Sequence, residues 1–379
     1  MSEWKTYRLG DICSRIKSGK GIPASKVSPT GKYPVIGGNG IRGYTDTSNF
    51  KGDCAVVGRQ GAYCGNVRFF TGEAYMTEHA VVIVGNELAD TKYLAYLLSI
   101  MQLGHLSAQS AQPGLSVQTL SKLSIDIPDL STQQQIAAIL GALDDKIELN
   151  RRINANLEEQ AQALFKSWFV DFEPFRDGPF VDSELGKIPK GWKVEVLSNF
   201  AKVTKKGISP SVSETYNHYS IPAYDDAQFP EKQSGRAIKS GKYIVYDNSV
   251  LLSKLNPRIK RLWFIKAAEE NAICSTEFIP IQTKNNDLIS FVFYLIDSDI
   301  FYQQALSLAN GATGSHQRFH VEDIMQIPFA WNEDIAIGFA QKTNCILQKI
   351  EDNIRENQTL SALRDTLLPK LMAGEIAIE

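Results

Sequence analysis

The feature that most constrains this chain is a long heptad pattern that occurs twice. Across residues 136–168, apolar side chains recur at alternating steps of four and three, interrupted only by Asn150 and Asn154. This spacing places them along one face of an amphipathic helix. The pattern recurs 203 residues later, across residues 339–371, with asparagines at the same two steps. A chain that encodes one long helix twice, each time after a domain-sized segment, is expected to be an internal repeat.

The segments that precede the two helices also correspond to each other. The opening residues recur at an offset of 188, and later dipeptides such as Thr77-Glu78 and Thr276-Glu277 keep their order, whereas the central loops differ. We therefore expect two similar α/β (α+β) globular domains separated by a long antiparallel two-helix coiled coil with pseudo-two-fold symmetry. The expected divisions are a first domain at 1–130, a long spacer helix at 131–173, a linker at 174–190, a second domain at 191–330 and a second spacer helix at 331–379.

The order of domain, helix, domain, helix also predicts how the helices pair. If they run antiparallel about a two-fold axis, facing positions have numbers that sum to 507, so Asn150 faces Asn357 and Asn154 faces Asn353. Buried amides that pair only in this register would specify it at some cost in stability. The alternative is that these asparagines lie on a solvated flank of a broader bundle.

Local signals place the elements around these helices. Ser131 is a plausible N-cap of the first long helix, and residues 91–104 have helical spacing. Short runs at 33–36, 54–57, 67–70 and 80–84 have the composition of strands. Prolines and glycines between residues 174 and 191 indicate a linker.

Composition is that of a folded protein, with 43% hydrophobic and 22% charged residues in 379. No apolar run approaches the ~20 residues of a membrane span, and the first residues lack a signal-peptide pattern, so a cytoplasmic location is expected. The five scattered cysteines are expected to be reduced thiols. The net charge of −2 excludes a uniformly basic nucleic-acid binder, although the two domain segments are slightly basic and the helical ones acidic.

The sequence contains partial matches to cofactor- and metal-binding motifs, but the residues around each match do not fit the motif. Residues 38–43 match G-x-G-x-x-G, but a turn-like segment follows where a helix would have to begin. Residues 235–243 resemble a phosphate-binding loop, but the spacing is one residue too long. His316 and His320 could face one way on a helix, yet no third metal ligand is evident. We therefore expect neither a catalytic site nor a metal site, which favours recognition over chemistry.

Polar and aromatic loop residues are the best positive signal for function. Arg, Lys, Asn and Gln are the side chains that read base edges, and Arg and Lys also contact phosphates. A solvated surface of alternating charge is the alternative interpretation. The candidate DNA-binding residues are Lys20, Asn39, Arg42, Tyr44, Arg59, Gln60, Tyr63, Asn66, Arg68, Gln109 and Gln112 in the first domain, and Lys205, Lys206, Lys254, Asn256, Arg258, Lys260, Arg261, His316, Gln317 and Arg318 in the second.

The whole chain resembles the specificity subunits of type I restriction–modification systems. The resemblance rests on the duplicated frame and on the loop motifs around residues 33–38 and 43–44. It also rests on the opening Trp4 with Leu9-Gly10-Asp11-Ile12, which residues 198–200 match only loosely in the second domain. Its most specific stretches are residues 133–137, 144–150 and 367–376.

This resemblance implies two target recognition domains that bind the halves of a split DNA sequence, with the helices as a ruler for the unread spacer. The subunit would have no catalytic site and no cofactor of its own. It would associate with two modification subunits that methylate adenine N6 using S-adenosylmethionine, and with restriction subunits that use ATP and Mg²⁺. A two-headed scaffold or adhesion protein that binds protein or carbohydrate is the alternative, and an enzyme with an unrecognised site is a third possibility.

Overall fold

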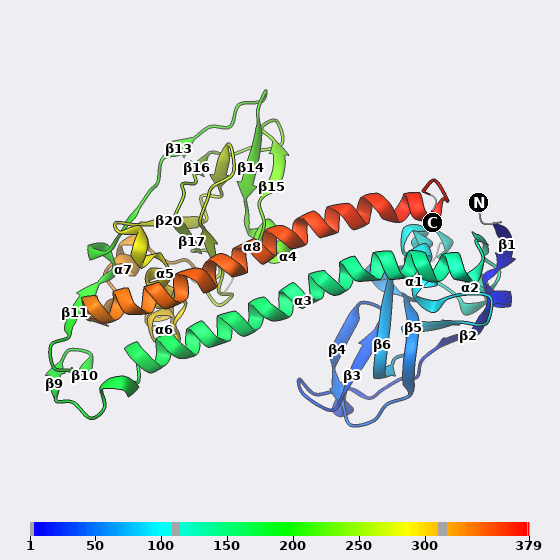
Figure 1. Cartoon of the computed structure of the whole chain (residues 1–379), viewed down its shortest axis with the longest axis horizontal. Coiled ribbons are helices and arrows are strands. Elements are labelled where there is room, and N and C mark those ends of the chain that lie inside the picture. Colours follow the sequence, from blue (N-terminus) through cyan, green and yellow to red (C-terminus); the bar gives the residue numbers. More distant parts are fainter. Residues whose placement is uncertain (1–3, 108–113, 310–316, 377, 379) are drawn as a thin grey trace. The chain divides into compact units, whose positions relative to one another are not determined.

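The computed structural model describes residues 4–107, 114–309, 317–376 and 378 (Figure 1). The chain divides into two compact units. Unit 1 comprises residues 1–145 and 360–379, and unit 2 comprises residues 146–359. Both boundaries fall inside long helices, because α3 extends over Leu130–Phe169 and α8 over Glu333–Met372. Each unit therefore contains a globular body together with one part of each long helix.

This division differs from the expected separation of domains and helices. In unit 1, Ile136 and Leu140 of α3 pack with Leu371 of α8 in the same apolar cluster as Leu9 and Leu94 of the globular body. Because these helix positions complete the core of the body, they belong to the same compact unit.

Unit 1 is built on a six-stranded sheet with the order β2-β7-β5-β6-β3-β4, in which only β3 and β6 pair in parallel. A separate antiparallel pair joins β1 to β8, and α1 packs on β5 and β6. The elements that precede α3 are β1 (Lys5–Arg8), η1 (Leu9–Ile12), β2 (Cys13–Ser18), η2 (Ala24–Lys26), β3 (Tyr33–Gly37), β4 (Gly40–Thr45), β5 (Phe50–Gly58), η3 (Gly61–Tyr63), β6 (Val67–Met76), β7 (Ala80–Gly85), α1 (Thr91–Ile100), η4 (Leu103–Leu106), α2 (Val117–Ser121) and β8 (Ser124–Ile127).

Unit 2 contains a four-stranded antiparallel sheet, β12-β20-β17-β18, and a separate five-stranded sheet, β13-β16-β19-β14-β15. A separate pair joins β11 to β21. The elements between α3 and α8 are η5 (Glu173–Phe175), β9 (Phe180–Ser183), β10 (Gly186–Pro189), β11 (Lys193–Val196), η6 (Leu197–Asn199), β12 (Ala201–Val203), β13 (Gly207–Ile208), β14 (Thr215–Tyr219), α4 (Ile221–Ala227), β15 (Glu231–Ser234), β16 (Lys242–Ile244), β17 (Ser249–Ser253), β18 (Leu262–Ile265), β19 (Ala272–Cys274), β20 (Phe278–Thr283), η7 (Asn286–Leu288), α5 (Ile289–Asp297), α6 (Asp299–Leu308), α7 (Val321–Met325) and β21 (Pro328–Trp331).

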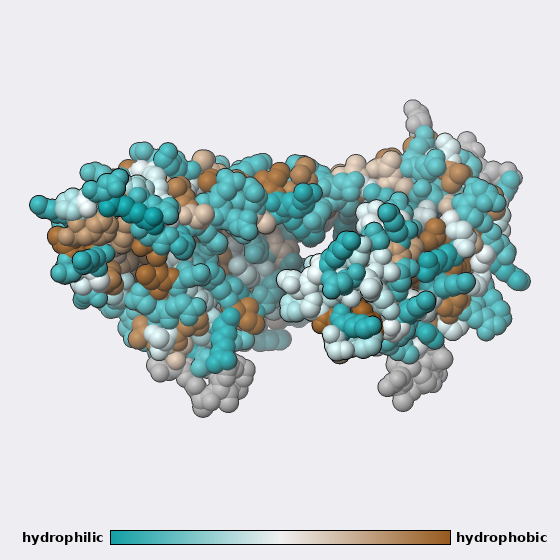
Figure 2. Space-filling model, turned by 90° about the horizontal axis from the view of Figure 1, so that it is seen from below, coloured by the Kyte–Doolittle hydropathy of each residue, from teal (hydrophilic) through white to brown (hydrophobic). Residues whose placement is uncertain are grey.

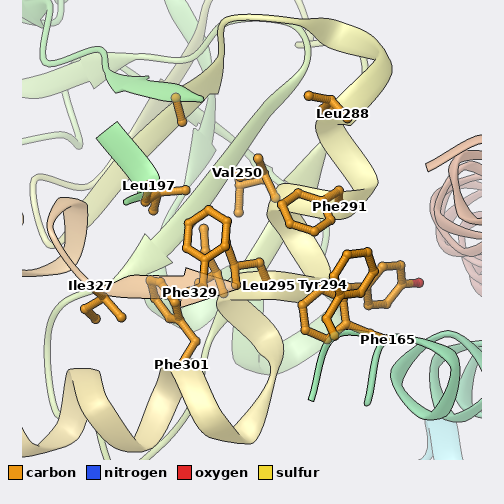
Figure 3. Close-up of a cluster of buried hydrophobic side chains, with 14 of the residues drawn as sticks. Phe165, Leu197, Val250, Leu288, Phe291, Tyr294, Leu295, Phe301, Ile327 and Phe329 are labelled. Carbon is orange, nitrogen blue, oxygen red and sulfur yellow. The ribbon is translucent and has the colours of Figure 1, made fainter. Parts of the chain in front are cut away.

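The two cores use different side chains. Aliphatic residues dominate the core of unit 1, whereas aromatic rings fill much of the core of unit 2. Phe291 of α5 is fully buried, and its ring centroid lies 5.9 Å from that of Phe165 on α3 and 5.9 Å from that of Phe329 on β21 (Figure 3). Hydrophilic residues cover much of the face shown in Figure 2, with hydrophobic residues in smaller patches.

The start of α3 and the linker differ from expectation. Asp129 caps the helix in place of Ser131, because the Thr132 N–H donates to Asp129 Oδ1 at 3.0 Å. This bond to the carboxylate lowers the pKa of Asp129. The segment expected to be a linker at 174–190 instead contains the antiparallel hairpin β9–β10. None of the helices in the described ranges combines the length and apolar character needed to cross a membrane.

Candidate nucleic-acid interface

Three connections of the unit 1 sheet meet at one place. They are the β3–β4 turn at Gly38 and Asn39, the β5–β6 connection that begins at Arg59, and the β6–β7 turn that ends at His79. A Cβ added at Gly38 would lie 3.1 Å from the carbonyl oxygen of His79 and 3.3 Å from the Cα of Gly58. The hairpin tip therefore approaches the other two connections closely enough that a larger residue would displace it.

The backbone of Arg59 joins these connections. Its N–H donates to the His79 carbonyl at 2.9 Å, and its own carbonyl accepts from the Leu115 N–H at 2.9 Å. The Arg59 residue is half-buried, and Arg68 Nη2 lies 3.4 Å from Asn39 Oδ1. Three of the residues expected from the sequence, Asn39, Arg59 and Arg68, therefore lie around one site.

Most of the other candidates of unit 1 lie on or beside these three connections. Gln60, Tyr63 and Asn66 are exposed on the β5–β6 connection. The exposed Lys20 donates its N–H to the Met76 carbonyl at 2.9 Å, beside the β6–β7 turn. Arg42 is exposed on β4, with its side chain against Gly37 at the hairpin tip.

Tyr44 lies apart from these residues. It pairs with Pro34 at the end of the hairpin away from the tip, and it exchanges two backbone hydrogen bonds with Ser28. Gln109 and Gln112 lie outside the described residues.

Sequence reasoning did not assign the β6–β7 turn itself to the interface. Thr77, Glu78 and His79 occupy this turn, and His79 Nε2 lies 3.3 Å from Glu78 Oε1. One signal in the sequence pointed to this turn, because Thr77-Glu78 recurs as Thr276-Glu277. That echo marked the turn as part of the frame but did not show that Arg59 lies against it.

Unit 2 has the corresponding backbone pattern at Lys254. The Lys254 N–H donates to the Glu277 carbonyl at 2.9 Å, and the Lys254 carbonyl accepts from the Phe319 N–H at 3.1 Å. In both units the next residue forms an isolated bridge, Gln60 with Gly114 and Leu255 with Arg318. The same three segments of backbone therefore meet in each unit, although their side chains differ.

Besides Lys254 itself, four expected residues of unit 2 lie around this site. The Asn256 N–H donates to the Gln317 carbonyl at 3.1 Å, and Arg318 Nε lies 3.1 Å from Glu277 Oε2. The Ile259 N–H donates to the Asn256 carbonyl at 3.0 Å, which closes a turn that exposes Arg258.

Like Arg318, two further expected cations are paired with carboxylates. Arg261 is only 8% exposed, and its guanidinium makes two hydrogen bonds to Asp225, at 2.6 and 2.8 Å. Lys260 Nζ lies 2.8 Å from Asp297 Oδ1. Asp225 therefore holds the buried Arg261 within the fold, whereas Lys260 is exposed but paired with Asp297. Both side chains are less available to DNA than the sequence suggested.

The remaining candidates of unit 2 lie elsewhere or are not described. Lys205 and Lys206 are exposed between β12 and β13, where the Lys206 carbonyl accepts from the Ile244 N–H. His316 lies outside the described residues. Over the described part of the chain, no group of three or more histidine, cysteine or acidic residues is placed to hold a metal ion.

The asparagines of the two long helices meet in unit 2 in the pairs named from the sequence. Asn150 Nδ2 donates to Asn357 Oδ1 at 2.9 Å, and Asn353 Nδ2 donates to Asn154 Oδ1 at 2.7 Å. Asn154 Nδ2 in turn donates to the Ile350 carbonyl at 3.1 Å. Asn150 and Asn353 are fully buried. The helices therefore run antiparallel within this unit.

Comparison with known proteins shows what the chain is similar to. Residues 1–159 match the model described as the type I restriction modification DNA specificity domain. The MjaIX type I restriction enzyme specificity subunit of Methanocaldococcus jannaschii is 28% identical over 317 residues, which cover 76% of this chain and 70% of that protein. The EcoprrI specificity subunit of Escherichia coli is 38% identical over 146 residues, which cover 38% of this chain and 36% of that protein.

Residues 1–159 therefore match the type I specificity domain, and most of the chain is similar to type I specificity subunits. The fold agrees, because the S subunit of a type I restriction–modification system from M. genitalium superimposes with a TM-score of 0.61 at 16% identity, over 98% of this chain and 96% of that one. Type I specificity subunits are non-catalytic, and the match of residues 1–159 to a DNA specificity domain points to DNA target recognition.

Proposed function

We propose that this chain is a type I specificity subunit and that it recognises a two-part DNA target, one part through each unit. The observation that carries this proposal is the shared backbone pattern at Arg59 and Lys254, where three segments meet in each unit. A common frame with different loop side chains suits two heads that read different sequences. Base recognition requires amides and guanidinium groups in defined positions, and the clusters around both residues contain them.

The proposed recognition domains are residues 1–130 and 191–330, connected through residues 174–190. The helices at 131–173 and 331–379 would form an antiparallel coiled coil that sets the length of the unread spacer. From residue 136 to residue 168 a helix rises by about 50 Å. The paired asparagines would hold the register, because a slipped pairing would bury amides against apolar side chains.

Partner subunits would supply the chemistry. We infer that two modification subunits methylate adenine N6 with S-adenosylmethionine and that restriction subunits cleave DNA with ATP and Mg²⁺. The net charge of −2 supports weak DNA binding by the chain alone, because phosphate contacts from cationic side chains supply much of the affinity for DNA.

The test is to assemble the chain with its modification subunits and to sequence the methylated sites. We expect a target of two short motifs separated by a fixed gap. Arg59→Ala should relax one motif and Lys254→Ala the other. Lys51→Ala on β5 and Lys266→Ala after β18 remove exposed cations elsewhere in the same units and should leave both motifs intact. A single contiguous motif, or the same motif affected by both variants, would contradict the proposal.

Salt titration of binding provides a second measurement. Phosphate contacts release counterions, so the observed affinity should fall steeply with salt. A binding constant that barely changes with salt would instead favour a protein- or carbohydrate-binding scaffold.

A further inference from the structure

A connection of the same length occurs at the candidate interface of each unit. The β5–β6 connection joins the paired residues Val57 and Val67, and the β17–β18 connection joins the paired residues Leu252 and Leu262, which are likewise ten positions apart. The two connections are offset by 195 residues, so each residue of one has a counterpart in the other. Their side chains can therefore be compared position by position.

The two connections also form the same turn. The Cys64 N–H donates to the Gly61 carbonyl at 3.0 Å, and the Ile259 N–H donates to the Asn256 carbonyl at 3.0 Å. Gly61 and Asn256 are counterparts, and their φ angles are positive, at 78° and 48°. Glycine and asparagine adopt this left-handed conformation more readily than other residues. The backbone of the turn is therefore the same in the two units although the residues differ.

The side chain that this turn exposes differs between the units. It is Tyr63 in unit 1 and Arg258 in unit 2, and both are exposed. A phosphate contact carries no sequence information, so a cationic side chain would serve it equally well in both units. A position with the same backbone but a different polar side chain is better suited to reading bases.

The turn that carries Arg258 is anchored by two other segments. The Asn256 N–H donates to the Gln317 carbonyl at 3.1 Å, and the hydroxyl of Tyr302 on α6 donates to the Pro257 carbonyl at 2.9 Å. Both Pro257 and Tyr302 are buried. The backbone beside Arg258 is therefore held in position before DNA binds, which reduces the entropy lost in a contact that requires a defined orientation.

Arg258 has no acidic partner, unlike the two other arginines around this site. Arg261 is paired with Asp225, and Arg318 with Glu277. Among the described residues, none forms a hydrogen bond or an ion pair with the Arg258 guanidinium. Its N–H donors, which are arranged as a rigid planar fork, are therefore available to a ligand.

We propose that Arg258 reads a guanine in the part of the DNA target that unit 2 recognises. Its guanidinium donates two parallel hydrogen bonds, to O6 and N7 of the base, in the major groove. Tyr63, at the equivalent place in unit 1, has a single hydroxyl and cannot form this pair of bonds. The inference rests on the proposed function, because it assigns one base to one residue of the same interface.

The test uses the complex of the full chain with its modification subunits, and its methylated sites are sequenced. The unchanged chain should give a two-part motif with a fixed G·C pair in one part. Arg258→Ala should relax that pair alone, with discrimination against the other base pairs falling by about tenfold to a hundredfold. Arg236→Ala removes another exposed arginine of unit 2, in the segment after β15, and should leave the whole motif unchanged.

Two further measurements separate base reading from a phosphate contact. Arg258→Lys keeps the positive charge but lacks the planar fork, so it should relax the same G·C pair. 7-Deazaguanine at that pair removes the N7 acceptor. It should slow methylation by the unchanged complex by about tenfold, the loss expected for one hydrogen bond to a charged group, and should not slow the Arg258→Ala complex. Circular dichroism verifies the fold of each variant.

The outcomes distinguish this inference from the proposed function. A contiguous motif, or no motif, from the unchanged chain would contradict the proposed function and the inference together. A two-part motif that Arg258→Ala leaves intact, or relaxes only at an A·T pair, would overturn the inference alone. An equal loss of methylation at all sites that Arg258→Lys restores would also overturn it, because a phosphate contact weakens binding to every sequence alike.

Discussion

The two units of this chain share a strand order but differ in what is attached to it. The order β2-β7-β5-β6 in unit 1 corresponds to β12-β20-β17-β18 in unit 2. The registers also correspond, because Val57 pairs with Val67 and Leu252 with Leu262, each at an offset of 195. Unit 1 extends this sheet with the β3–β4 hairpin, whereas unit 2 carries a separate five-stranded sheet.

This difference shows which parts of the frame are tolerant of change. Backbone hydrogen bonds do not depend on side-chain identity, so the strand order is compatible with an aliphatic core in one unit and an aromatic core in the other. The connections at the end of the sheet are not needed to maintain this strand order, so their sequences can differ between the units. Recognition residues are therefore expected where the two units differ in sequence but agree in backbone.

The largest expected effect concerns the two cores. Phe291→Ala removes a fully buried ring from unit 2 and should cost about 3–5 kcal/mol of unfolding free energy, and Leu94→Ala should cost about 2–5 kcal/mol in unit 1. Hydrogen exchange read by mass spectrometry should show the loss of protection mainly in the unit that carries the change. Equal loss in both units for each variant would mean that they unfold as one and would break the comparison.

The second prediction concerns the asparagines of unit 2. Asn353→Ala removes the donor to the buried Asn154 and should cost about 1–3 kcal/mol. The double change Asn154→Leu with Asn353→Leu removes both polar groups and should recover much of that loss. Urea denaturation of the single and double variants measures the coupling. If the double variant loses more unfolding free energy than the two single variants lose together, the amides contribute to stability as well as to register.

The third prediction concerns the ion pair between Arg364 and Asp144 in unit 1. Arg364→Ala leaves Asp144 with only the Tyr96 hydroxyl and should cost about 1–2 kcal/mol, since the pair is partly exposed. Protection from hydrogen exchange should fall in residues 130–145 and remain in unit 2. Arg152→Ala, an exposed cation on α3 in unit 2, is the matched control. Equal losses in the two variants would exclude a specific role for the pair.

The smallest expected effect compares the two helix caps. Asp129 and Asn332 are 203 residues apart and cap α3 and α8, with Asn332 Oδ1 accepting from the Ile335 N–H at 3.2 Å. Alanine at either position should cost about 1 kcal/mol.

Only the Asp129 cap should depend on pH. Because folding lowers the pKa of Asp129, its stabilisation is present above the unfolded pKa and is lost as the pH falls through the lower, folded one. Stability measured between pH 7 and pH 2 should therefore converge for Asp129→Ala and the unchanged chain at the acid end. A constant difference across that range would show that the carboxylate charge does not contribute.

Local, regular patterns in the sequence were the most informative. The heptad steps predicted two long helices and named the pairs Asn150 with Asn357 and Asn154 with Asn353, which the structure contains. The mixed α/β class also follows from short runs of alternating residues. These features are readable because a helix or strand repeats at a fixed period, so each residue's environment depends on its neighbours in the chain.

Tertiary structure decided which polar side chains are available. Arg261 looks like a DNA-binding residue in the sequence, yet Asp225, 36 residues away, holds it within unit 2. The turn at His79 is assigned to the interface only because the Arg59 N–H donates to the His79 carbonyl. No periodic pattern encodes such contacts, since they depend on how distant segments pack. Ala161 and Arg364 illustrate the same limit: the echo aligns them, but only the packed structure shows that Arg364 pairs with Asp144 whereas Ala161 lies in the apolar core of unit 2.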